Sequence, residues 1–319
     1  MDEFRLIDAI HRAVRGAADS RVEIGIGDDA AVLAVRSGRV VATTDALVEG
    51  VHFRWDLCRP ADVGWRAGAV NLSDLAAMGA RPLALLAALE IPPVMPDRDV
   101  VAVMRGLARC GKAFGAPVVG GNLAAGPAFA VTVTALGEPS CGRVLSRAGA
   151  LPGDAILVAG PVGAGAMGLD LLSRHPDWAH RFPALARAYR RPVPQVLAGM
   201  HLAGLDGVHA AIDVSDGLLA DLGHVMKVSG VGARLDTERI PLHPQAIRYA
   251  REAGTDALGC ALSGGDDYRL VAVAAPGAVP ACEALGLQAV GEVTRRRGLV
   301  VRTGGKRVVA AGAGGYRHR

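Results

Sequence analysis

Aspartates carry the clearest chemical signal in this sequence of 319 residues, because 22 of its 31 acidic residues are Asp. Several follow short apolar runs and lie beside Gly, Ser or Thr. They are Asp28 and Asp29 in GIGDDAAVL, Asp45 in TTDAL, Asp74 in NLSDLAAMG, Asp213 and Asp216 in DVSDGLL, and Asp266 and Asp267 in SGGDDYRL. Short carboxylates on a fixed backbone suit a hard cation such as Mg²⁺, which commonly bridges protein carboxylates to phosphates.

Each acidic stretch alone also has an ordinary structural explanation. GDD can form a hairpin turn, and SGGDD can be a plain loop. Ser73 or Asp74, and likewise Ser215 or Asp216, can cap the N-terminus of a helix. Five acidic stretches brought together in one cleft would repel one another unless cations neutralised them. Their joint occurrence therefore favours phosphate chemistry with several Mg²⁺ ions.

Two further side chains could contact a phosphate. His52 follows Asp45 by seven residues, in EGVHF, and Arg147 lies in LSRAGALPGD. A loop or partly buried histidine and a surface arginine are the simpler interpretations of these residues. An arginine near a domain boundary can nevertheless reach a shared cleft and pair with phosphate through two hydrogen bonds.

Two glycine-rich stretches resemble nucleotide-binding motifs without completing them. GLARCGKA, residues 106–113, nearly matches the P-loop, but Ala113 replaces the Ser or Thr whose hydroxyl would hold Mg²⁺, and the stretch has a helical pattern. GAGAMG, residues 163–168, matches GxGxxG, yet no second strand ending in an acid follows at the required distance. We expect GAGAMG to be a turn that packs a helix on a strand.

The elements that must position these residues alternate between strand and helix patterns, which predicts an α/β (α+β) protein. Strands are expected at 30–35, 39–44, 83–91, 116–122, 129–138, 155–160 and 208–214, and helices at 61–80, 100–115 and 215–226. Gly, Pro and Ser accumulate at 138–154, where the periodicity lapses. We therefore expect two domains, 1–140 and 141–319.

Composition excludes several classes of function. The net charge is +4, but 32 of the 35 basic residues are scattered arginines without interleaved aromatic residues, which argues against nucleic-acid binding. The five cysteines form no CxxC pair, which fits a reducing cytosol. No apolar run reaches the roughly 18 residues of a spanning helix. We expect a cytoplasmic protein with no membrane or nucleic-acid partner.

Six stretches, in this order and over nearly the whole chain, carry a resemblance to a known family. They are GIGDDAAVL, TTDALVEGVHF, AVNLSDLAAMGARP, LSRAGALPGD, IDVSDGLLADLGH and LSGGDDYRL. The sequence resembles the thiamine-monophosphate kinases of the aminoimidazole ribonucleotide synthetase-like superfamily. The resemblance implies that 1–140 binds ATP and Mg²⁺ and pairs its sheet with a second subunit in a homodimer, and that 141–319 closes the active-site cleft. The implied reaction is ATP-dependent phosphorylation of thiamine monophosphate to thiamine diphosphate.

The resemblance also implies roles for individual residues. The implied metal ligands are Asp28, Thr43, Thr44, Asp45, Asp74, Asn122, Asp213 and Asp216. Gly121, Asn122, Arg147 and Ser215 would contact ATP, and His52, Asp266 and Tyr316 would face thiamine monophosphate. Asp45, Arg147 and Asp213 would carry the transfer itself.

Three positions depart from the pattern usual in this family. GGNL stands where GGDT is usual, so Asn122 replaces a metal-binding Asp; SGGDD replaces SGGED; and Ala313 stands where an aromatic residue could stack on thiamine. Two alternatives remain at this level: a non-catalytic protein that binds nucleotide or divalent cations, and another enzyme of the superfamily, such as aminoimidazole ribonucleotide synthetase.

Overall fold

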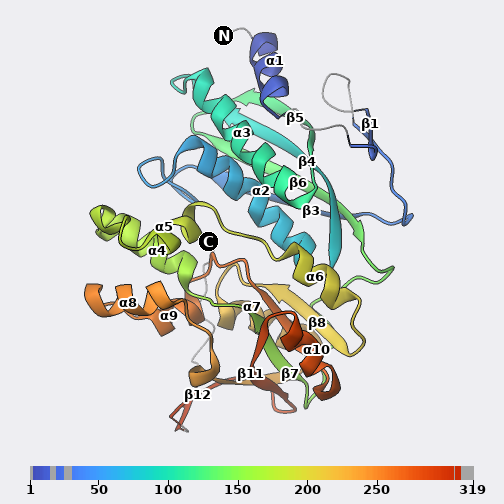
Figure 1. Cartoon of the computed structure of the whole chain (residues 1–319), viewed down its shortest axis with the longest axis vertical. Coiled ribbons are helices and arrows are strands. Elements are labelled where there is room, and N and C mark those ends of the chain that lie inside the picture. Colours follow the sequence, from blue (N-terminus) through green and yellow to red (C-terminus); the bar gives the residue numbers. More distant parts are fainter. Residues whose placement is uncertain (1–2, 15–18, 25–30, 305, 310–319) are drawn as a thin grey trace. The chain divides into compact units, whose positions relative to one another are not determined.

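A computed structural model of the chain describes residues 3–14, 19–24, 31–304 and 306–309. The chain forms two compact units. Unit 1 comprises Met1–Leu75 and Ala80–Gly142, and unit 2 comprises Ala76–Gly79 and Arg143–Arg319. Both are mixed α/β units, and Figure 1 shows the sheet and helices of each.

Unit 1 is built on a four-stranded sheet in the order β3-β6-β4-β5. The strands are β3 (Val41–Val48), β4 (Ala80–Ile91), β5 (Val118–Ala125) and β6 (Ala130–Pro139). Only β4 and β5 run parallel, and β3 and β5 form the two edges of the sheet. The remaining elements of unit 1 are α1 (Glu3–Val14), β1 (Val22–Ile24), β2 (Val32–Leu33), α2 (Pro60–Ala77) and α3 (Asp97–Phe114).

The two faces of this sheet differ in burial, as alternation along the strands requires. On one face Leu85, Val131 and Val133 are fully buried, and α2 and α3 lie across the sheet (Figure 1). The opposite face presents half-buried or exposed residues of all four strands. They are Thr44, Ala46, Leu86, Ala88, Asn122, Thr132 and Thr134, and we call them the uncovered face.

Unit 2 contains a seven-stranded sheet in the order β13-β12-β9-β11-β7-β10-β8, in which only β12 and β9 run parallel. Its strands are β7 (Ala155–Ala159), β8 (Val208–Asp213), β9 (Gly232–Asp236), β10 (Leu270–Ala274), β11 (Leu287–Thr294), β12 (Gly298–Thr303) and β13 (Lys306–Val309). Its helices are α4 (Ala164–Arg174), α5 (Pro183–Arg190), α6 (Val196–Ala203), α7 (Leu218–Ser229), α8 (Pro244–Ala253), α9 (Ala257–Ser263) and α10 (Val279–Ala284). Its apolar core joins the sheet to α7 and α9.

The sequence-based prediction placed correctly most of the elements that it named, but it ended two strands too early. The strand expected at 39–44 is β3, which continues to Val48 because β6 pairs with all eight of its residues. Asp45 therefore lies within a strand, not after one. The strand expected at 116–122 likewise continues as β5 to Ala125, paired with β4. Of the strand expected at 30–35, only Val32–Leu33 pairs.

The structure also decides between the alternatives for the glycine-rich and capping stretches. GLARCGKA lies inside α3, so it forms no P-loop. GAGAMG opens α4, but both sheet neighbours of β7 are antiparallel, so there is no dinucleotide-binding βαβ unit. The helix-cap interpretations were wrong: Asp74 lies in the last turns of α2, and the N-cap of α7 is Gly217. None of the described helices is both long enough and apolar enough to span a membrane.

Candidate functional site

In unit 1, the predicted ligands Thr43 and Asp74 lie in direct contact. The Thr43 hydroxyl on β3 donates a 2.6 Å hydrogen bond to Asp74 Oδ2 on α2. Thr43 and Asp45 are two residues apart in a strand, so their side chains share a face of the sheet. The Asp45 side chain is exposed on this edge strand. The structure therefore places on this face of the sheet three side chains whose oxygen atoms could bind a metal ion: Thr43, Asp45 and Asp74.

Thr44 points to the opposite face, as the residue between Thr43 and Asp45 must. Its hydroxyl lies 3.1 Å from the Thr134 hydroxyl and 3.2 Å from the Val133 carbonyl oxygen. The structure therefore does not bring the Thr44 hydroxyl together with Asp45 and Asp74.

Gly121 and Asn122 lie on β5, at the edge of the sheet opposite to β3. Asp45 pairs with Val133, Val133 with Ala87, and Ala87 with Gly121, so Asp45 and Gly121 end the same cross-strand row. Three strand spacings separate them, which is about 14 Å. Asn122, in the next row, belongs to the uncovered face together with Thr44. One sheet therefore does not bring Asn122 beside Asp45.

His52 lies in the turn that follows β3. The Nδ1 atom of its ring accepts a hydrogen bond from the backbone N–H of Val48 at 3.1 Å. The backbone N–H of His52 donates to the Val48 carbonyl oxygen at 2.9 Å. With Nδ1 as acceptor, the proton of a neutral imidazole lies on Nε2. The turn thus fixes the ring in the tautomer that carries its proton on Nε2.

In unit 2, the two acidic stretches DVSDG and SGGDDYRL run side by side. Asp213 ends β8 and pairs with Leu270 of β10. Beyond the strands, Asp266 N–H donates to the Ser215 carbonyl oxygen and Tyr268 N–H donates to the Val214 carbonyl oxygen, both at 2.8 Å. Backbone hydrogen bonds therefore hold the predicted residues Asp213, Ser215 and Asp266 in one loop pair, 213–217 with 263–268.

The 263–268 loop has an unusual backbone. Asp266 and Tyr268 have φ of 60° and 51°, a left-handed conformation that few residues other than glycine adopt. Gly265 has a φ of +69°, and a Cβ there would lie 2.3 Å from the Ser215 carbonyl oxygen. The Tyr268 hydroxyl donates a 2.9 Å hydrogen bond to Asp266 Oδ1. Strain of this kind persists only where the surroundings enforce it, and it is concentrated at functional sites.

Sequence reasoning gave no role to Asp221, which organises the 213–217 loop. One oxygen, Asp221 Oδ2, accepts the backbone N–H groups of Ser215, Asp216 and Gly217 at 3.0, 3.1 and 3.1 Å. Burial, together with the nearby charges of Asp213 and Asp216, raises the pKa of Asp221 to about 7. The signal in the sequence was an Asp in the first turn of a helix that follows DVSDG.

Asp267 also has a structural role that the sequence did not reveal. Its carboxylate accepts the backbone N–H groups of Gly163 at 2.6 Å and Gly165 at 3.0 Å, so it ties the 263–268 loop to the GAGAMG turn. Burial raises its pKa to about 6. The adjacent acids Asp266 and Asp267 thus differ: Asp266 is half-buried, and Asp267 is buried against backbone.

Arg147 lies in a segment that runs beside β8, the outer strand of the sheet. The Ala211 N–H donates to the Ser146 carbonyl oxygen at 2.9 Å, and the Arg143 guanidinium donates to the Val208 carbonyl oxygen at 2.7 Å. Arg147 itself is exposed. Its backbone is therefore anchored near the strand that ends in Asp213.

Several predicted residues fall outside the part of the chain that the structure describes. Asp28 and Asp29, Ala313 and Tyr316 are among them, so their predicted roles stay predictions. Among the described residues, no three His, Cys, Asp or Glu side chains gather into a group that could hold a metal ion. A divalent cation would therefore need further ligands, such as hydroxyl groups, water or phosphate oxygens.

The sequence matches the models of both domains of one family. Residues 27–138 match "AIR synthase related protein, N-terminal domain" and residues 152–304 match "AIR synthase related protein, C-terminal domain". The thiamine-monophosphate kinase of Salmonella typhimurium is 41% identical over 271 residues, covering 84% of this chain and 81% of that protein. That of Mycobacterium tuberculosis is 38% identical, covering 85% and 80%.

Solved structures show similarity to the same group of proteins. The thiamine-monophosphate kinase of Stenotrophomonas maltophilia superposes with a TM-score of 0.81 at 36% identity, covering 96% of this chain and 98% of that one. AaThiL, complexed with AMPPCP and TMP, gives a TM-score of 0.80 at 31% identity, covering 99% and 97%. These similarities extend over the acidic stretches of both units, and on this basis the chain belongs to the AIR synthase related proteins and, within them, to the thiamine-monophosphate kinase family.

Proposed function

We propose that the protein transfers the γ-phosphoryl group of ATP to thiamine monophosphate and so forms thiamine diphosphate. The observation that carries this proposal is the loop pair of unit 2, in which backbone hydrogen bonds hold Asp213, Ser215 and Asp266 together in a chain of this family. The complex of AaThiL with AMPPCP, an ATP analogue, and TMP supports both substrates.

The donor groups fit Mg²⁺. Asp213, Asp216 and Asp221 lie close enough for their charges to raise the pKa of Asp221, and a cation would relieve this repulsion. In unit 1, Thr43, Asp45 and Asp74 offer hard oxygen ligands. Mg²⁺ usually takes only one or two carboxylates and completes its shell with water and substrate phosphates. When bound, it would neutralise phosphate charge.

The protein would act chiefly by positioning. The acceptor is a phosphate that is already ionised at neutral pH, so the reaction needs no general base to create the nucleophile. Phosphoryl transfer of this kind depends on holding two anions in line and offsetting the charge on the transferring group. Arg147 is the cation that we assign to that task, and Asp45 and Asp213 are the carboxylates that we assign to metal binding.

The remaining predicted residues would set the positions of the substrates. We assign Gly121, Asn122 and Ser215 to the nucleotide. We assign His52, through the donor at Nε2, and Asp266, oriented by the Tyr268 hydroxyl, to thiamine monophosphate. Tyr316 belongs to the same proposed group. Because Asn122 offers a carbonyl oxygen without the charge of the usual Asp, we expect a metal site with one negative charge fewer.

We further propose that the protein is a homodimer and acts in the cytoplasm, where ATP is available. The uncovered face supports the first proposal, because its exposed residues of small size, such as Ala46 and Ala88, allow a close approach of a second sheet.

The test is an assay with purified protein, ATP, Mg²⁺ and thiamine monophosphate in which thiamine diphosphate is followed by chromatography. We expect product from thiamine monophosphate and none from free thiamine or aminoimidazole precursors. Asp45→Ala should fold but lose turnover by on the order of 100-fold or more. The matched control is Asp56→Ala, which removes an exposed acid paired with Arg54 and should keep activity.

Absence of product from the wild-type protein, despite Mg²⁺-dependent binding of ATP, would contradict the kinase assignment and favour a nucleotide-binding protein. A folded Asp45→Ala variant with wild-type turnover would contradict the metal assignment alone.

A further inference from the structure

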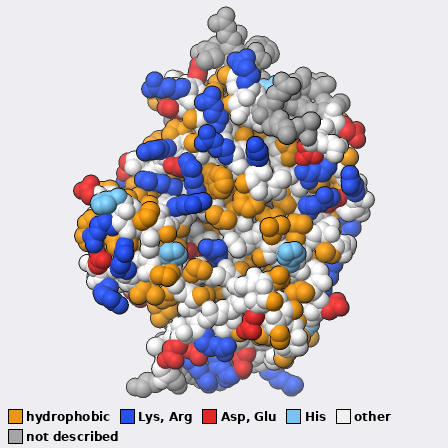
Figure 2. Space-filling model, viewed as in Figure 1, with side chains coloured by type: hydrophobic (Ala, Val, Ile, Leu, Met, Phe, Trp, Pro, Cys, Tyr) orange, Lys and Arg blue, Asp and Glu red, His pale blue; other side chains and the backbone are white. Residues whose placement is uncertain are grey.

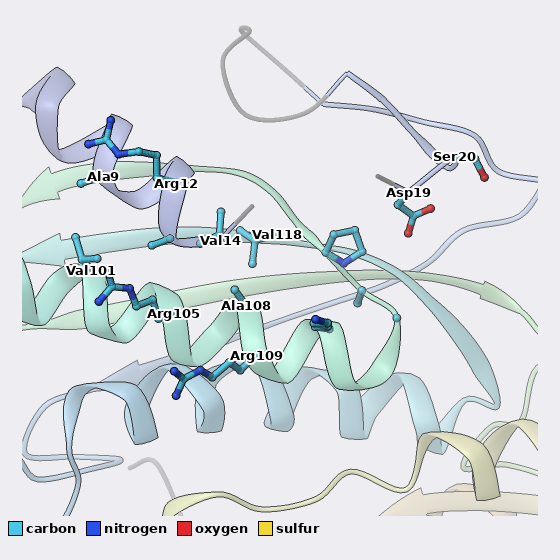
Figure 3. Close-up of a pocket in the computed structure, with 15 residues that line it drawn as sticks. Ala9, Arg12, Val14, Asp19, Ser20, Val101, Arg105, Ala108, Arg109 and Val118 are labelled. Carbon is cyan, nitrogen blue, oxygen red and sulfur yellow. The ribbon is translucent and has the colours of Figure 1, made fainter. Parts of the chain in front are cut away.

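Unit 1 contains a cavity of about 1010 Å³ that none of the residues assigned above to metal or substrate lines. Its walls come from α1, from α3 and from the segments around Ser20 and Gly115 (Figure 3). Its apolar residues are Ala9, Ala13, Val14, Val101, Ala108, Ala116, Pro117 and Val118. Small-molecule sites are typically concave and mostly apolar and have volumes up to roughly 1,000 Å³, so the size is appropriate for a small ligand.

Four cations surround this apolar surface. Arg12 comes from α1, and Arg105, Arg109 and Lys112 come from α3 at spacings of four and three residues, which place them on one side of the helix. Figure 3 shows Arg105 and Arg109 on successive turns of α3 and Arg12 on the neighbouring helix α1. In Figure 2 the Lys and Arg side chains gather over the region of α3.

Among the side chains that the structure describes, no carboxylate forms an ion pair with Arg105, Arg109 or Lys112. Of the described residues that line the cavity, only Asp19 is acidic, and Arg21 already engages it, with Nε 3.0 Å from Oδ1 and Nη2 2.6 Å from Oδ2. Hydrogen bonding to Arg21 lowers the pKa of Asp19, so this carboxylate stays ionised and paired. The same guanidinium donates to the Gly115 and Pro82 carbonyl oxygens, which fixes the pair in place.

The clustered positive charges on α3 destabilise the helix, and an anionic ligand can remove this destabilisation. Like charges spaced three or four residues apart on a helix repel each other and destabilise it. The other side of α3 is occupied by the core residues Val103, Met104 and Leu107, so the helix cannot turn the arginines away from one another without exposing apolar surface. Arginine forks match phosphate oxygens geometrically, so a bound polyphosphate would convert this repulsion into attraction.

We propose that this cavity binds a small molecule that carries a diphosphate or triphosphate group, at a site separate from the proposed phosphoryl-transfer site. The phosphates would contact Arg105, Arg109 and Lys112, and the remainder of the ligand would cover the apolar surface near Ala13 and Val118. Because Arg12 belongs to α1 and the other cations to α3, the ligand would fasten α1 to α3. The described residues of the cavity lining include no aromatic side chain, which disfavours a single-stranded nucleic acid.

The experiment measures binding of inorganic tripolyphosphate by calorimetry, in EDTA so that Mg²⁺-dependent sites do not contribute. Three proteins are compared: the wild type, Arg105→Gln/Arg109→Gln, and the control Arg98→Gln. Arg98 is an exposed arginine of the same helix that does not line the cavity. We expect affinity to fall at least about tenfold in the double variant and to change by less than about twofold in the control.

Hydrogen exchange of the wild-type protein locates the binding site without any substitution. This measurement therefore tests the proposal even if the double variant misfolds. Tripolyphosphate should protect backbone amides of residues 9–14 and 105–118. Displacement of tripolyphosphate by ADP or by thiamine diphosphate would identify the natural source, and either result supports the proposal. Equal affinity of the wild type and a folded double variant, no protection in these segments, or binding only of oligonucleotides or anionic vesicles would overturn it.

Discussion

One carboxylate oxygen of Asp221 holds three consecutive backbone N–H groups of the loop that follows β8. In Asp221→Ala, these donors would lose their partner, at a cost of about 1–3 kcal/mol for each one left buried. We expect a lower melting temperature, and a kcat/KM that falls by on the order of 100-fold because Asp213 and Asp216 lose their fixed positions. Asp221→Asn keeps an acceptor of the same shape and should recover most of the stability.

Thermal denaturation and the Mg²⁺ dependence of kcat/KM measure the two effects. Asp177→Ala, which removes an exposed acid of the same unit, is the control. Wild-type stability and Mg²⁺ dependence in Asp221→Ala would mean that the loop does not depend on this residue.

Asp267 predicts a dependence of stability on pH. Burial raises its pKa to about 6 from the usual value of 3.8, so between about pH 4 and pH 6 the folded protein binds a proton that the unfolded chain has lost. The stabilisation that this proton provides is therefore complete below this range. As pH rises through the range, the free energy of unfolding decreases by up to about 1.4 kcal/mol per pH unit. Asp221, with a pKa raised to about 7, extends the decrease to neutral pH.

Urea denaturation at pH 5, 6 and 7.5 gives the free energy of unfolding for the wild type and for Asp267→Asn. We expect the variant to be less stable at every pH, because an amide nitrogen would face one of the two glycine N–H groups. Its free energy of unfolding should nevertheless decrease less between pH 5 and pH 6. Identical slopes for the two proteins would contradict the assignment of this titration to Asp267.

At the scale of elements, the pairing of β4 and β5 depends on a glycine. A Cβ on Gly121 would lie 1.9 Å from the Ala87 carbonyl oxygen, whereas a Cβ on Gly120 would meet only the Leu86 Cδ2 atom, at 3.0 Å. Backbone cannot move aside as easily as the end of a side chain. We expect Gly121→Ala to lower the free energy of unfolding by about 1–3 kcal/mol or more, and Gly120→Ala by less.

These neighbouring glycines form a matched pair, because both lie in β5 and both gain one methyl group. Chemical denaturation compares them directly. Equal losses of stability would show that any Gly→Ala substitution in β5 is equally destabilising, so that the contact with Ala87 would not explain the loss at Gly121.

Most elements of unit 1 and the strands β7 and β8 followed from the apolar periodicity, but the prediction did not include β9 to β13, and it did not give the positions of the functional residues within their elements. Asp45 is unfavourable in a strand by propensity, yet eight pairs with β6 carry β3 past it to Val48. The contact between Thr43 and Asp74 joins residues 31 positions apart, and nothing local to either residue indicates it. Asp267 accepts backbone N–H groups of a distant turn, which have no signature in the sequence.

At the scale of the whole molecule, the proposed homodimer can be tested on the uncovered face. Ala88 is exposed there in the interior strand β4, so Ala88→Arg should not disturb the fold of one chain but should separate two packed sheets. Light scattering should give twice the mass of one 32.7 kDa chain for the wild type and one chain mass for the variant.

Val94→Arg is the control, because Val94 is 90% exposed in a turn, and this variant should remain dimeric. A dimeric Ala88→Arg protein would place the subunit contact elsewhere.

The chain passes between its two units three times, at 75/76, at 79/80 and at 142/143. Residues 76–79 belong with unit 2: Leu145 N–H donates to the Met78 carbonyl oxygen at 3.0 Å, and a Cβ on Gly199 would lie 2.0 Å from the Ala76 carbonyl oxygen. A single recombination event near residue 142 would therefore exchange most of unit 2 while leaving four of its residues behind. The second half of such a gene would still need a glycine at position 199, because the backbone of residue 76 leaves no room there for a Cβ.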